Sequence, residues 1–399
     1  MLTRYQATAL ALTCFAAAFG AACHGGNGGG DEAILADVPS FAVGVTPALE
    51  LADDGSAERQ FTRVLTARLP NGDLLAADGG SKELRVFRDG VLQARLSRQG
   101  NGPGELQDIQ RIALAHDTIF VMALPMVSRH INIFSTGSGF MARHRLRPQE
   151  GAPSFVPIDR LATGAFLVEE GRGFTAISQE PPIGQLLPDS VTLGLFRPGA
   201  DDSTGIYRSL GRFFRHHTVA FRTPGMPMPF SMSPYSLGAT TSWAVAGDVI
   251  WIGEGATGAM RAFDGEGRLV VEAALPVTQQ SWDQDALRRA RDAAITGADT
   301  EMQRAAAEAI HDPALRPATM PVLDAMVPGP DGEVWVRRYR LERRSGQEFL
   351  VMSRTGRIVG QVLVPDDVTV HQAGQGFFVG VRRDEDGVES VVEYRLTRN

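Results

Sequence analysis

From residue 61 onward, short apolar runs alternate with tight turns in a regular order. In FTRVLTARLPNGDLLAAD (61–78), a strand-like run, a glycine turn and a second apolar run follow one another. Apolar and polar positions that alternate around such turns predict an antiparallel β-hairpin. The same arrangement recurs at 108–124, 155–170, 240–254, 322–339 and 368–382. Five of these six hairpins turn on glycine, and the other turns on His116-Asp117.

A second hairpin follows in five of the six units. These hairpins span 83–96, 130–146, 190–210, 259–275 and 349–364, whereas the last unit ends with one strand, 391–396. Near the N-terminus, residues 40–51 alternate like a strand and have no partner nearby in sequence. Pairing of 40–51 with 391–396 would complete a sixth four-stranded sheet. The pattern therefore predicts an all-β fold, a six-bladed β-propeller closed by its two ends, which leaves only short protected sheet edges.

A helical insertion interrupts the strands over about 281–310. Residues 281–295 and 299–310 have the composition of two short helices, separated near Gly297. A two-domain chain with its boundary near 280–312 is the alternative interpretation. That division would leave 40–51 without a partner, so we favour a single ring.

The stretch RQGNGPGELQ (98–107) is rich in glycine and lies between the first and second predicted blades. A phosphate-binding loop would need a helix after it and, for a P-loop, a Gly-Lys-Ser/Thr ending. Neither feature is present in the sequence. We therefore expect a turn in which glycine permits positive φ and Pro103 stiffens the chain.

Several of these segments resemble a known family. LPNGDLLAAD, RVFRDG, RQGNGPGEL and the closing RRDEDGVESVVEYRL resemble the bacterial six-bladed propellers related to NHL and TolB-like repeats. The resemblance covers about 40–399 and implies a propeller in a secreted or lipid-anchored setting. It implies little about chemistry, because such propellers host many activities.

The N-terminal segment has the marks of an export signal. Arg4 precedes a short apolar stretch at 7–18, and small residues lead to Cys23. We expect a signal peptide over 1–22 and a flexible tether over 23–39. GAAC resembles a bacterial lipobox with Gly20 where leucine is usual, so Cys23 is the predicted site of lipid attachment.

The predicted location follows from this segment. We expect a membrane-anchored lipoprotein of the bacterial cell envelope, on the outer-membrane or periplasmic side. If cleavage occurs near Ala22 and Cys23 is not modified, the protein is secreted. The only cysteines, Cys14 and Cys23, lie in this segment, so no disulfide or cysteine-based zinc site is expected in the folded chain.

Loop lengths predict which face of the propeller is functional. The long connections are 171–189, 211–239 and 276–321, and we expect all three on the face opposite the hairpin turns. We call these the decorated face and the hairpin-turn face. Long loops are commonly functional. The propeller domain is thus expected over 40–399 with inter-blade insertions at 211–239 and 276–321, its tether leaving from the hairpin-turn face.

Charge and motifs narrow the chemistry. The formal net charge of −7 argues against a nucleic-acid partner. No G-x-S-x-G elbow occurs, and His216-His217 is a histidine pair without a second ligand cluster. The chain has five asparagines, which argues against the calcium site of six-bladed lactonases. We expect no metal and no cofactor.

Charged residues at the ends of the second strands are the candidate ligand-binding groups, because Arg suits carboxylate or phosphate. With the histidine pair, the candidates are Asp78, Glu170, His216, His217, Glu254, Arg338 and Arg382. The alternative is that the charged groups pair with each other as salt bridges.

The sequence favours a non-catalytic, monomeric binding scaffold of the cell envelope. It would present its decorated face to a protein, peptide or glycan, and would touch a membrane only through the lipid anchor. The alternative is a metal-dependent hydrolase or lyase, lactonase-like, with its site at the central channel.

Overall fold

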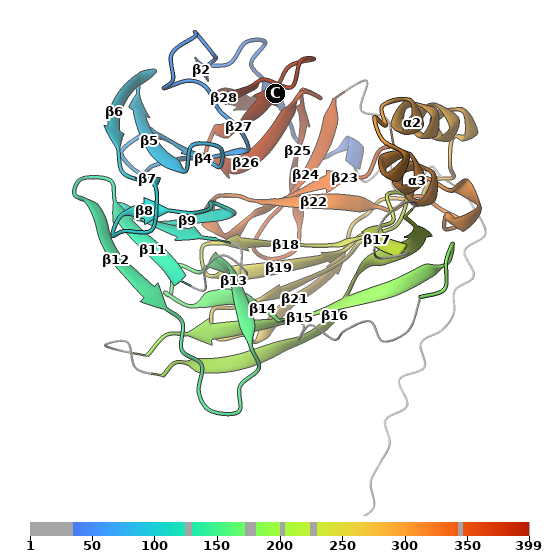
Figure 1. Cartoon of the computed structure of the whole chain (residues 1–399), viewed down its shortest axis with the longest axis horizontal. Coiled ribbons are helices and arrows are strands. Elements are labelled where there is room, and N and C mark those ends of the chain that lie inside the picture. Colours follow the sequence, from blue (N-terminus) through green and yellow to red (C-terminus); the bar gives the residue numbers. More distant parts are fainter. Residues whose placement is uncertain are drawn as a thin grey trace, which may run out of the picture.

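The computed structural model describes residues 35–123, 130–171, 181–199, 204–223, 230–341 and 346–398. The predicted signal peptide, Cys23 and most of the tether lie outside these residues. The described chain is an all-β ring of antiparallel sheets with two helices on one side (Figure 1). In the described part of the chain, we find no helix with the length and apolarity needed to cross a bilayer.

Four sheets follow one another along the chain. The first contains β3 (Val64–Arg68), β4 (Leu74–Asp78), β5 (Glu83–Arg88) and β6 (Val91–Arg95). The second contains β9 (Arg111–Ala115), β10 (Thr118–Met122), β11 (His130–Ser135) and β12 (Gly139–Arg145). The third contains β13 (Phe155–Arg160), β14 (Phe166–Glu170), β15 (Leu186–Arg197), β16 (Ile206–Arg222) and β17 (Phe230–Pro234). The fourth contains β18 (Thr241–Ala246), β19 (Val249–Glu254), β20 (Ala259–Phe263) and β21 (Leu269–Ala274).

A nine-stranded sheet completes the ring. Its first part is β22 (Leu323–Pro328), β23 (Val334–Arg338), β24 (Gln347–Met352) and β25 (Ile358–Val364). Its second part is β26 (Val368–Gly374), β27 (Phe377–Arg383), β28 (Glu389–Arg398) and β2 (Leu49–Leu51). β1 (Ser40–Val43) joins the two parts. The topology accommodates six blades, and the blade number itself stays a prediction.

Pairing of the two ends of the described chain is confirmed. Leu49–Leu51 pairs antiparallel with β28, with Leu51 opposite Val391. Phe41 to Val43 of β1 also pair with β28, beyond a break in the strand at 44–48. β1 additionally pairs parallel with β25, which the sequence pattern does not predict. The N-terminal segment therefore lies between β25 and β28 and pairs with both, in addition to closing the ring.

The glycine-rich stretch at 98–107 is a turn, as expected. β7 (Arg98–Gln99) and β8 (Glu105–Leu106) form a short parallel pair around it. The Glu105 carboxylate fills the turn and accepts a hydrogen bond of 2.8 Å from the Gly102 amide. A Cβ at Gly100 would lie 2.1 Å from the Glu105 carboxylate, and φ at Gly100 is +155°, so the loop wraps closely around its own side chain at a position that favours glycine.

Residues 211–239 differ from the expected loop. β16 is 17 residues long and continues through Arg222, and β17 adds a fifth strand to the third sheet. The segment GRFFRHHTVAFR (211–222) is rich in aromatic and β-branched residues, which favour strands. The predicted helices are present as α2 (Gln284–Thr296) and α3 (Glu301–Ile310).

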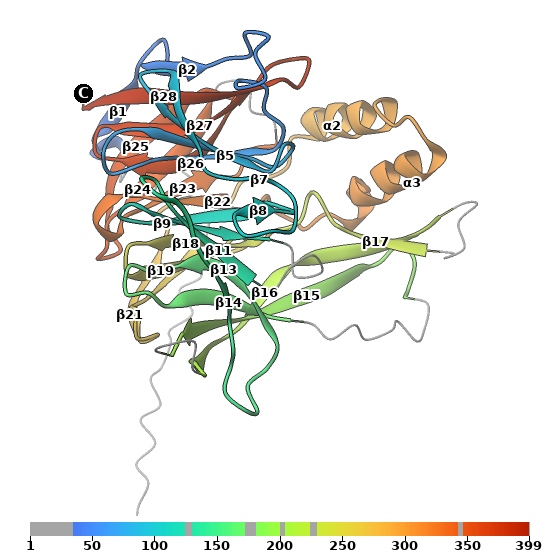
Figure 2. The ribbon, with the colours of Figure 1, turned by 60° about the vertical axis from the view of Figure 1, so that its left-hand side comes forward.

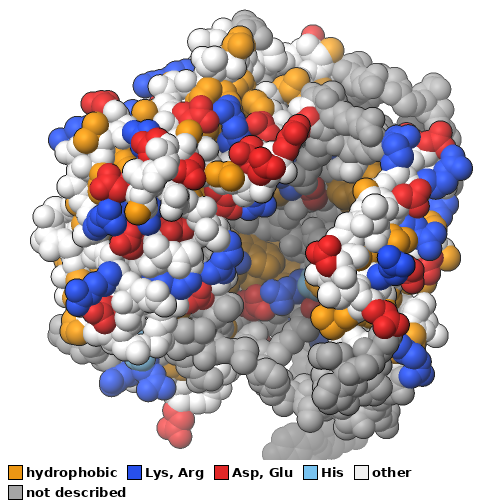
Figure 3. Space-filling model, turned by 45° about the horizontal axis from the view of Figure 1, so that its top comes forward, with side chains coloured by type: hydrophobic (Ala, Val, Ile, Leu, Met, Phe, Trp, Pro, Cys, Tyr) orange, Lys and Arg blue, Asp and Glu red, His pale blue; other side chains and the backbone are white. Residues whose placement is uncertain are grey.

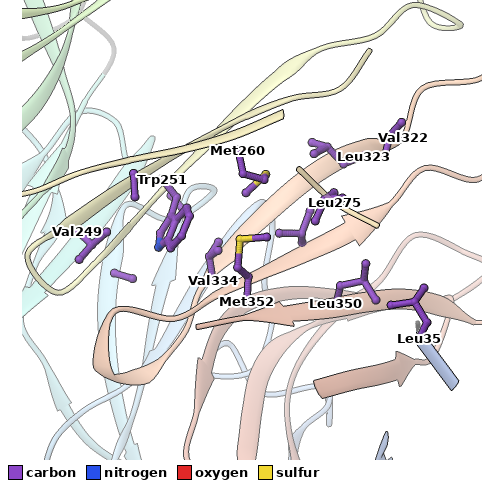
Figure 4. Close-up of a cluster of buried hydrophobic side chains, with 14 residues drawn as sticks. Leu35, Val249, Trp251, Met260, Leu275, Val322, Leu323, Val334, Leu350 and Met352 are labelled. Atoms are coloured by element: carbon purple, nitrogen blue, oxygen red, sulfur yellow. The ribbon is translucent and has the colours of Figure 1, made fainter. Parts of the chain in front are cut away.

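Apolar clusters between neighbouring sheets form the core. In one of them, Trp251 and Met260 of the fourth sheet face Val334 and Met352 of the next (Figure 4). Trp251 is fully buried, and its indole N–H donates to the Gly332 carbonyl oxygen at 3.0 Å. Each such large side chain contributes roughly 1.5–3 kcal/mol through burial.

Candidate functional site

Apart from the short β7–β8 pair, the strands fall into six groups, the four separate sheets and the two parts of the nine-stranded sheet. The first strand of each group lines one central cavity of about 670 Å³. Its walls come from six strands, β3, β9, β13, β18, β22 and β26. Figure 3 shows the molecule hollowed near its centre, with hydrophobic, basic and acidic side chains on the walls. We call this space the channel cavity. It also reaches hairpin-turn residues such as His116 and Gly247, so it extends toward the hairpin-turn face.

The polar residues that line the channel cavity include five from three strands, β9, β13 and β26: Arg111, Asp159, Arg160, His371 and Gln372. Two of the three strands that carry them are irregular. The ladder of β13 shifts between Pro157 and Asp159, and that of β26 shifts between Val370 and Gln372. Such bulges re-aim side chains, so the strict in-and-out alternation of a strand is lost at these positions.

His371 and Gln372 are held by the backbone of the first sheet. The Thr66 amide donates to His371 Nδ1 at 3.1 Å, and the Arg68 amide donates to Gln372 Oε1 at 2.7 Å. Because Nδ1 accepts, the proton of neutral His371 is on Nε2. Burial lowers the pKa of His371 to about 4, against the opposing charge of Glu389. The imidazole is therefore neutral at pH 7.

Asp159 and the two arginines set the charge of the cavity. Burial raises the pKa of Asp159 to about 7, although a hydrogen bond from the Arg160 amide and the charge of Arg111 act in the opposite direction. The Arg160 guanidinium lies 4.2 Å from the centre of the Phe120 ring. Near neutral pH the cavity thus holds two positively charged guanidinium groups and the carboxyl group of Asp159, which is about half ionised. This arrangement suits a polar or anionic ligand.

A projection rises from one side of the ring, where β17 and the far parts of β15 and β16 lie close to α2 and α3 (Figure 2). We define the projection as residues 181–190, 214–239 and 276–321, so far as they are described. It has its own apolar cluster, made mainly of Val219, Tyr235, Leu237, Trp282 and Leu287.

Hydrogen bonds tie the helices to the strands of the projection. The Tyr235 hydroxyl donates to the Asp312 carbonyl oxygen at 2.7 Å, and the Ser236 hydroxyl donates to that of Ile310 at 2.6 Å. The indole N–H of Trp282 donates to the Pro317 carbonyl oxygen at 2.7 Å. The insertion is therefore packed on β16 and β17 rather than hanging free.

The sequence-predicted candidates do not line the channel cavity. Asp78 is buried and accepts hydrogen bonds from Thr62, Gly80 and Ser81. Burial alone would raise the pKa of Asp78, but these bonds outweigh it and lower the pKa. Glu254 pairs with Arg261 at 3.0 Å.

The remaining candidates also have partners within their own surroundings. Arg338 pairs with Glu348 at 2.7 Å, and Arg382 pairs with Glu50 at 2.8 Å. Glu170 accepts a hydrogen bond of 2.5 Å from the Tyr207 hydroxyl. His216 lies 3.7 Å from the Asp189 carboxylate, and the ring centre of His217 lies 4.9 Å from that of Phe214. The seven do not gather in one place, and a ligand role for them stays a prediction.

The candidates predicted from the sequence lie mainly at the ends of the second strands, whereas the channel residues lie on the first strands. Their signal is visible afterwards in the first strands, where DIQRI, VPIDR and VTVHQ carry charged or polar residues inside apolar runs. Among the described residues, no group of three or more His, Cys, Asp or Glu side chains could hold a metal ion.

Comparisons with known proteins concern the fold. No protein-family model and no curated protein matches the chain. A candidate exported protein from Bacteroides fragilis is similar at 11% identity and a TM-score of 0.48, over 91% of this chain and 97% of that one. A DUF4221 family member from Bacteroides vulgatus is similar at 7% identity and 0.48, over 90% and 99%.

A β-propeller domain is also among the similar structures. The Cps50 (Swd1) propeller of Myceliophthora thermophila is 10% identical, with a TM-score of 0.37 over 88% of this chain and 99% of that one. At such identities and scores these likenesses carry no argument about function.

Proposed function

We propose that this protein is an exported, non-catalytic binding propeller whose projection forms the surface for a protein, peptide or glycan partner. The observation that carries the proposal is that one side of the ring carries a projection with an apolar cluster of its own. The ring closes through strands outside the projection, so the projection is not needed for closure. Additional segments of this kind on a rigid scaffold are typical of binding surfaces.

Exposed apolar side chains on the projection support this proposal. Ile183, Met232 and Met302 are 36%, 38% and 43% exposed. Methionine is flexible and polarizable, so it adapts to the shape of a partner. The charged helices around Met302 would supply the polar rim that protein interfaces have.

Site-specific photo-crosslinking tests which face meets a partner. A photoreactive residue at Met232 or Met302 should give a defined crosslinked product in envelope extract, which excess unmodified protein suppresses. Val91 and Leu269 are the matched control positions, because they are exposed and follow hairpin turns of the opposite face. Products formed only from Val91 or Leu269 would contradict the proposal.

The cellular location is part of the same proposal. We propose cleavage of residues 1–22 and lipid attachment at Cys23, with a ring related to NHL and TolB-like six-bladed propellers. Metabolic labelling with a palmitate analogue should label the wild-type chain and leave Cys23→Ser unlabelled. Labelling of Cys23→Ser at the wild-type level would sink the lipid anchor and leave the binding proposal standing.

A second candidate function is a hydrolase or lyase with its site in the channel cavity. The observation that favours it is that two groups with shifted pKa values, Asp159 and His371, line the same cavity, with Arg111 near Asp159. Shifted groups in one cavity are common at catalytic sites. Crystals soaked in calcium or zinc provide the test. Metal held in the cavity by several carboxylates or histidines would favour the enzyme over the binding scaffold.

A further inference from the structure

A second hollow lies between the second and third sheets, away from the projection's core. It consists of two neighbouring cavities of about 390 and 330 Å³ that share Arg145 and Leu146. We call it the inter-sheet groove. Arg160 lines both the groove and the channel cavity, and so forms part of the wall between them.

The walls of the groove are largely apolar. Phe120, Phe166 and Phe196 come from three different strands, and Ile131 and Ile133 come from a fourth. The rings of Phe120 and Phe166 meet edge-on with centres 6.3 Å apart. These side chains are largely buried, with Phe120, Phe166 and Phe196 8%, 5% and 1% exposed, and their edges form the apolar wall that the apolar part of a ligand would contact.

The charged residues of the groove are all basic. Arg145, Arg147 and Arg160 line it, and no Asp or Glu does so among the described residues. None of the three guanidinium groups forms an ion pair in the described part of the chain, and Arg160 Nη1 donates to the Leu161 carbonyl oxygen at 3.3 Å. The formal net charge of the protein is −7, so this cluster runs against the charge of the whole chain.

Of the three arginines, Arg160 has the largest unfavourable free energy of burial. It is half-buried, its guanidinium is stacked on Phe120, and burial lowers its pKa. A buried cation without a counter-charge is unfavourable unless another group supplies one. An anion bound elsewhere in the groove would offset part of this cost through its charge.

The rim of the groove is built rather than loose. The chain after β12 forms a short parallel bridge in which Pro148 lies opposite Gly205. The Gly205 amide donates to the Arg147 carbonyl oxygen at 2.9 Å, and the Gln149 amide donates to that of Gly205 at 3.2 Å. The backbone that carries Arg147 is thereby fixed to the third sheet.

We propose that the inter-sheet groove binds a small amphiphilic carboxylate, whose acid group meets Arg145 and Arg147 and whose apolar body lies along the phenylalanines. A planar guanidinium can hold a carboxylate through two parallel hydrogen bonds. The volume of each cavity lies at the lower end of the range of about 300–1,000 Å³ for small-molecule sites. This site is separate from the partner-binding role of the projection.

Titration calorimetry of the purified protein with decanoate tests this proposal. Decanoate should bind, and decanol, which has the same chain without the charge, should bind at least tenfold more weakly. Arg147→Gln should weaken decanoate binding about tenfold, the loss expected for one charge-assisted hydrogen bond. The melting temperature should not change, because Arg147 is exposed and its side chain has no described partner.

Arg357→Gln is the matched control, since it removes one exposed arginine from a hairpin turn of another sheet. It should leave decanoate binding at the wild-type level. Absence of decanoate binding, equal binding by Arg147→Gln and wild type, or equal binding of decanol would each overturn the proposal. A loss in Arg111→Gln without one in Arg147→Gln would move the anion to the channel cavity and overturn it as well.

Discussion

Two junctions between neighbouring sheets contain nearly the same pair of phenylalanine rings. They differ in whether the adjacent arginine forms ion pairs. At the closing junction, where the last group meets the first sheet, Phe61 and Phe87 meet edge-on with ring centres 6.4 Å apart. The Arg85 guanidinium lies 5.6 Å from the centre of Phe61. It pairs with Glu83 at 2.7 Å and with Asp78 at 3.5 Å, and its side chain is only 3% exposed.

At the open junction, between the second and third sheets, Phe120 and Phe166 meet edge-on at 6.3 Å. Arg160 lies 4.2 Å from the centre of Phe120, and no described carboxylate pairs with it. The aromatic packing is thus the same, whereas the counter-charge is present at one junction and missing at the other. The comparison shows that apolar packing holds both junctions together. The presence or absence of a nearby carboxylate then decides whether the arginine of a junction is already paired or can bind an anion.

Side chains also cover the free edge of β3 at the closing junction. The amides of Val64, Thr66 and Arg68 point away from β4 and donate to Glu389, His371 and Gln372. Backbone N–H groups left buried without acceptors are unfavourable. The polar side chains of the last group therefore do for β3 what a further strand would do.

The largest expected effect comes from removing one ring at each junction. Phe87→Ala should lower the free energy of unfolding by about 3–5 kcal/mol, because Phe87 is 1% exposed and the cavity left behind is sealed. Phe166→Ala should cost about 2 kcal/mol less, because the adjacent groove lets water and side chains fill the space. Urea unfolding of both variants measures the difference, and equal losses would mean that the open junction is sealed after all.

The ring and its closure could be predicted from the sequence, whereas the polar interior could not. Hairpin turns and alternating residues identify the strands, and the unpaired run at 40–51 points to its partner at 391–396. The bulges beside Asp159 and His371 cannot be recognised in the sequence pattern. Each bulge adds one residue to a strand and so changes which side chains face the channel. The strand at 211–222 was expected as a loop because it exceeds the length of the repeated hairpin.

The next largest effect is a loss of stability in acid that comes from the closing junction. The folded-state pKa of His371 is about 4, below the ordinary 6.5, so the unfolded chain binds more protons between these values. Stability is therefore complete above pH 6.5 and falls by up to about 3 kcal/mol as the pH decreases toward 4.

His371→Gln isolates this contribution, because glutamine can accept from the Thr66 amide without titrating. Urea unfolding from pH 7 to 4 should show a shallower loss for the variant than for wild type. Parallel profiles for the two proteins would show that His371 does not carry the effect.

A smaller effect is expected from Glu389 and its counterpart at the open junction. Glu389 Oε2 accepts from the buried Val64 amide at 2.8 Å, and Glu389→Ala should cost about 2 kcal/mol by leaving that donor unsatisfied. Arg147→Ala should stay within about 0.5 kcal/mol, as for other exposed residues without partners. Thermal unfolding compares the two, and a large loss in Arg147→Ala would reveal a stabilising role that the groove proposal does not include.

An effect smaller than that of Glu389 concerns Asp159, which has the opposite pH dependence from His371. Its folded-state pKa of about 7 lies above the ordinary 3.8, so the folded chain binds more protons in this range. Its contribution is complete below pH 3.8 and is lost as the pH rises through 7. Asp159→Asn cannot ionise, so its stability relative to wild type should increase by about 1 kcal/mol between pH 5.5 and 8, after allowance for solvent in the channel. Denaturant unfolding at the two pH values gives this number. A constant difference would mean that Asp159 is already ionised at pH 5.5, and the channel cavity would then carry less net positive charge than its two arginines imply.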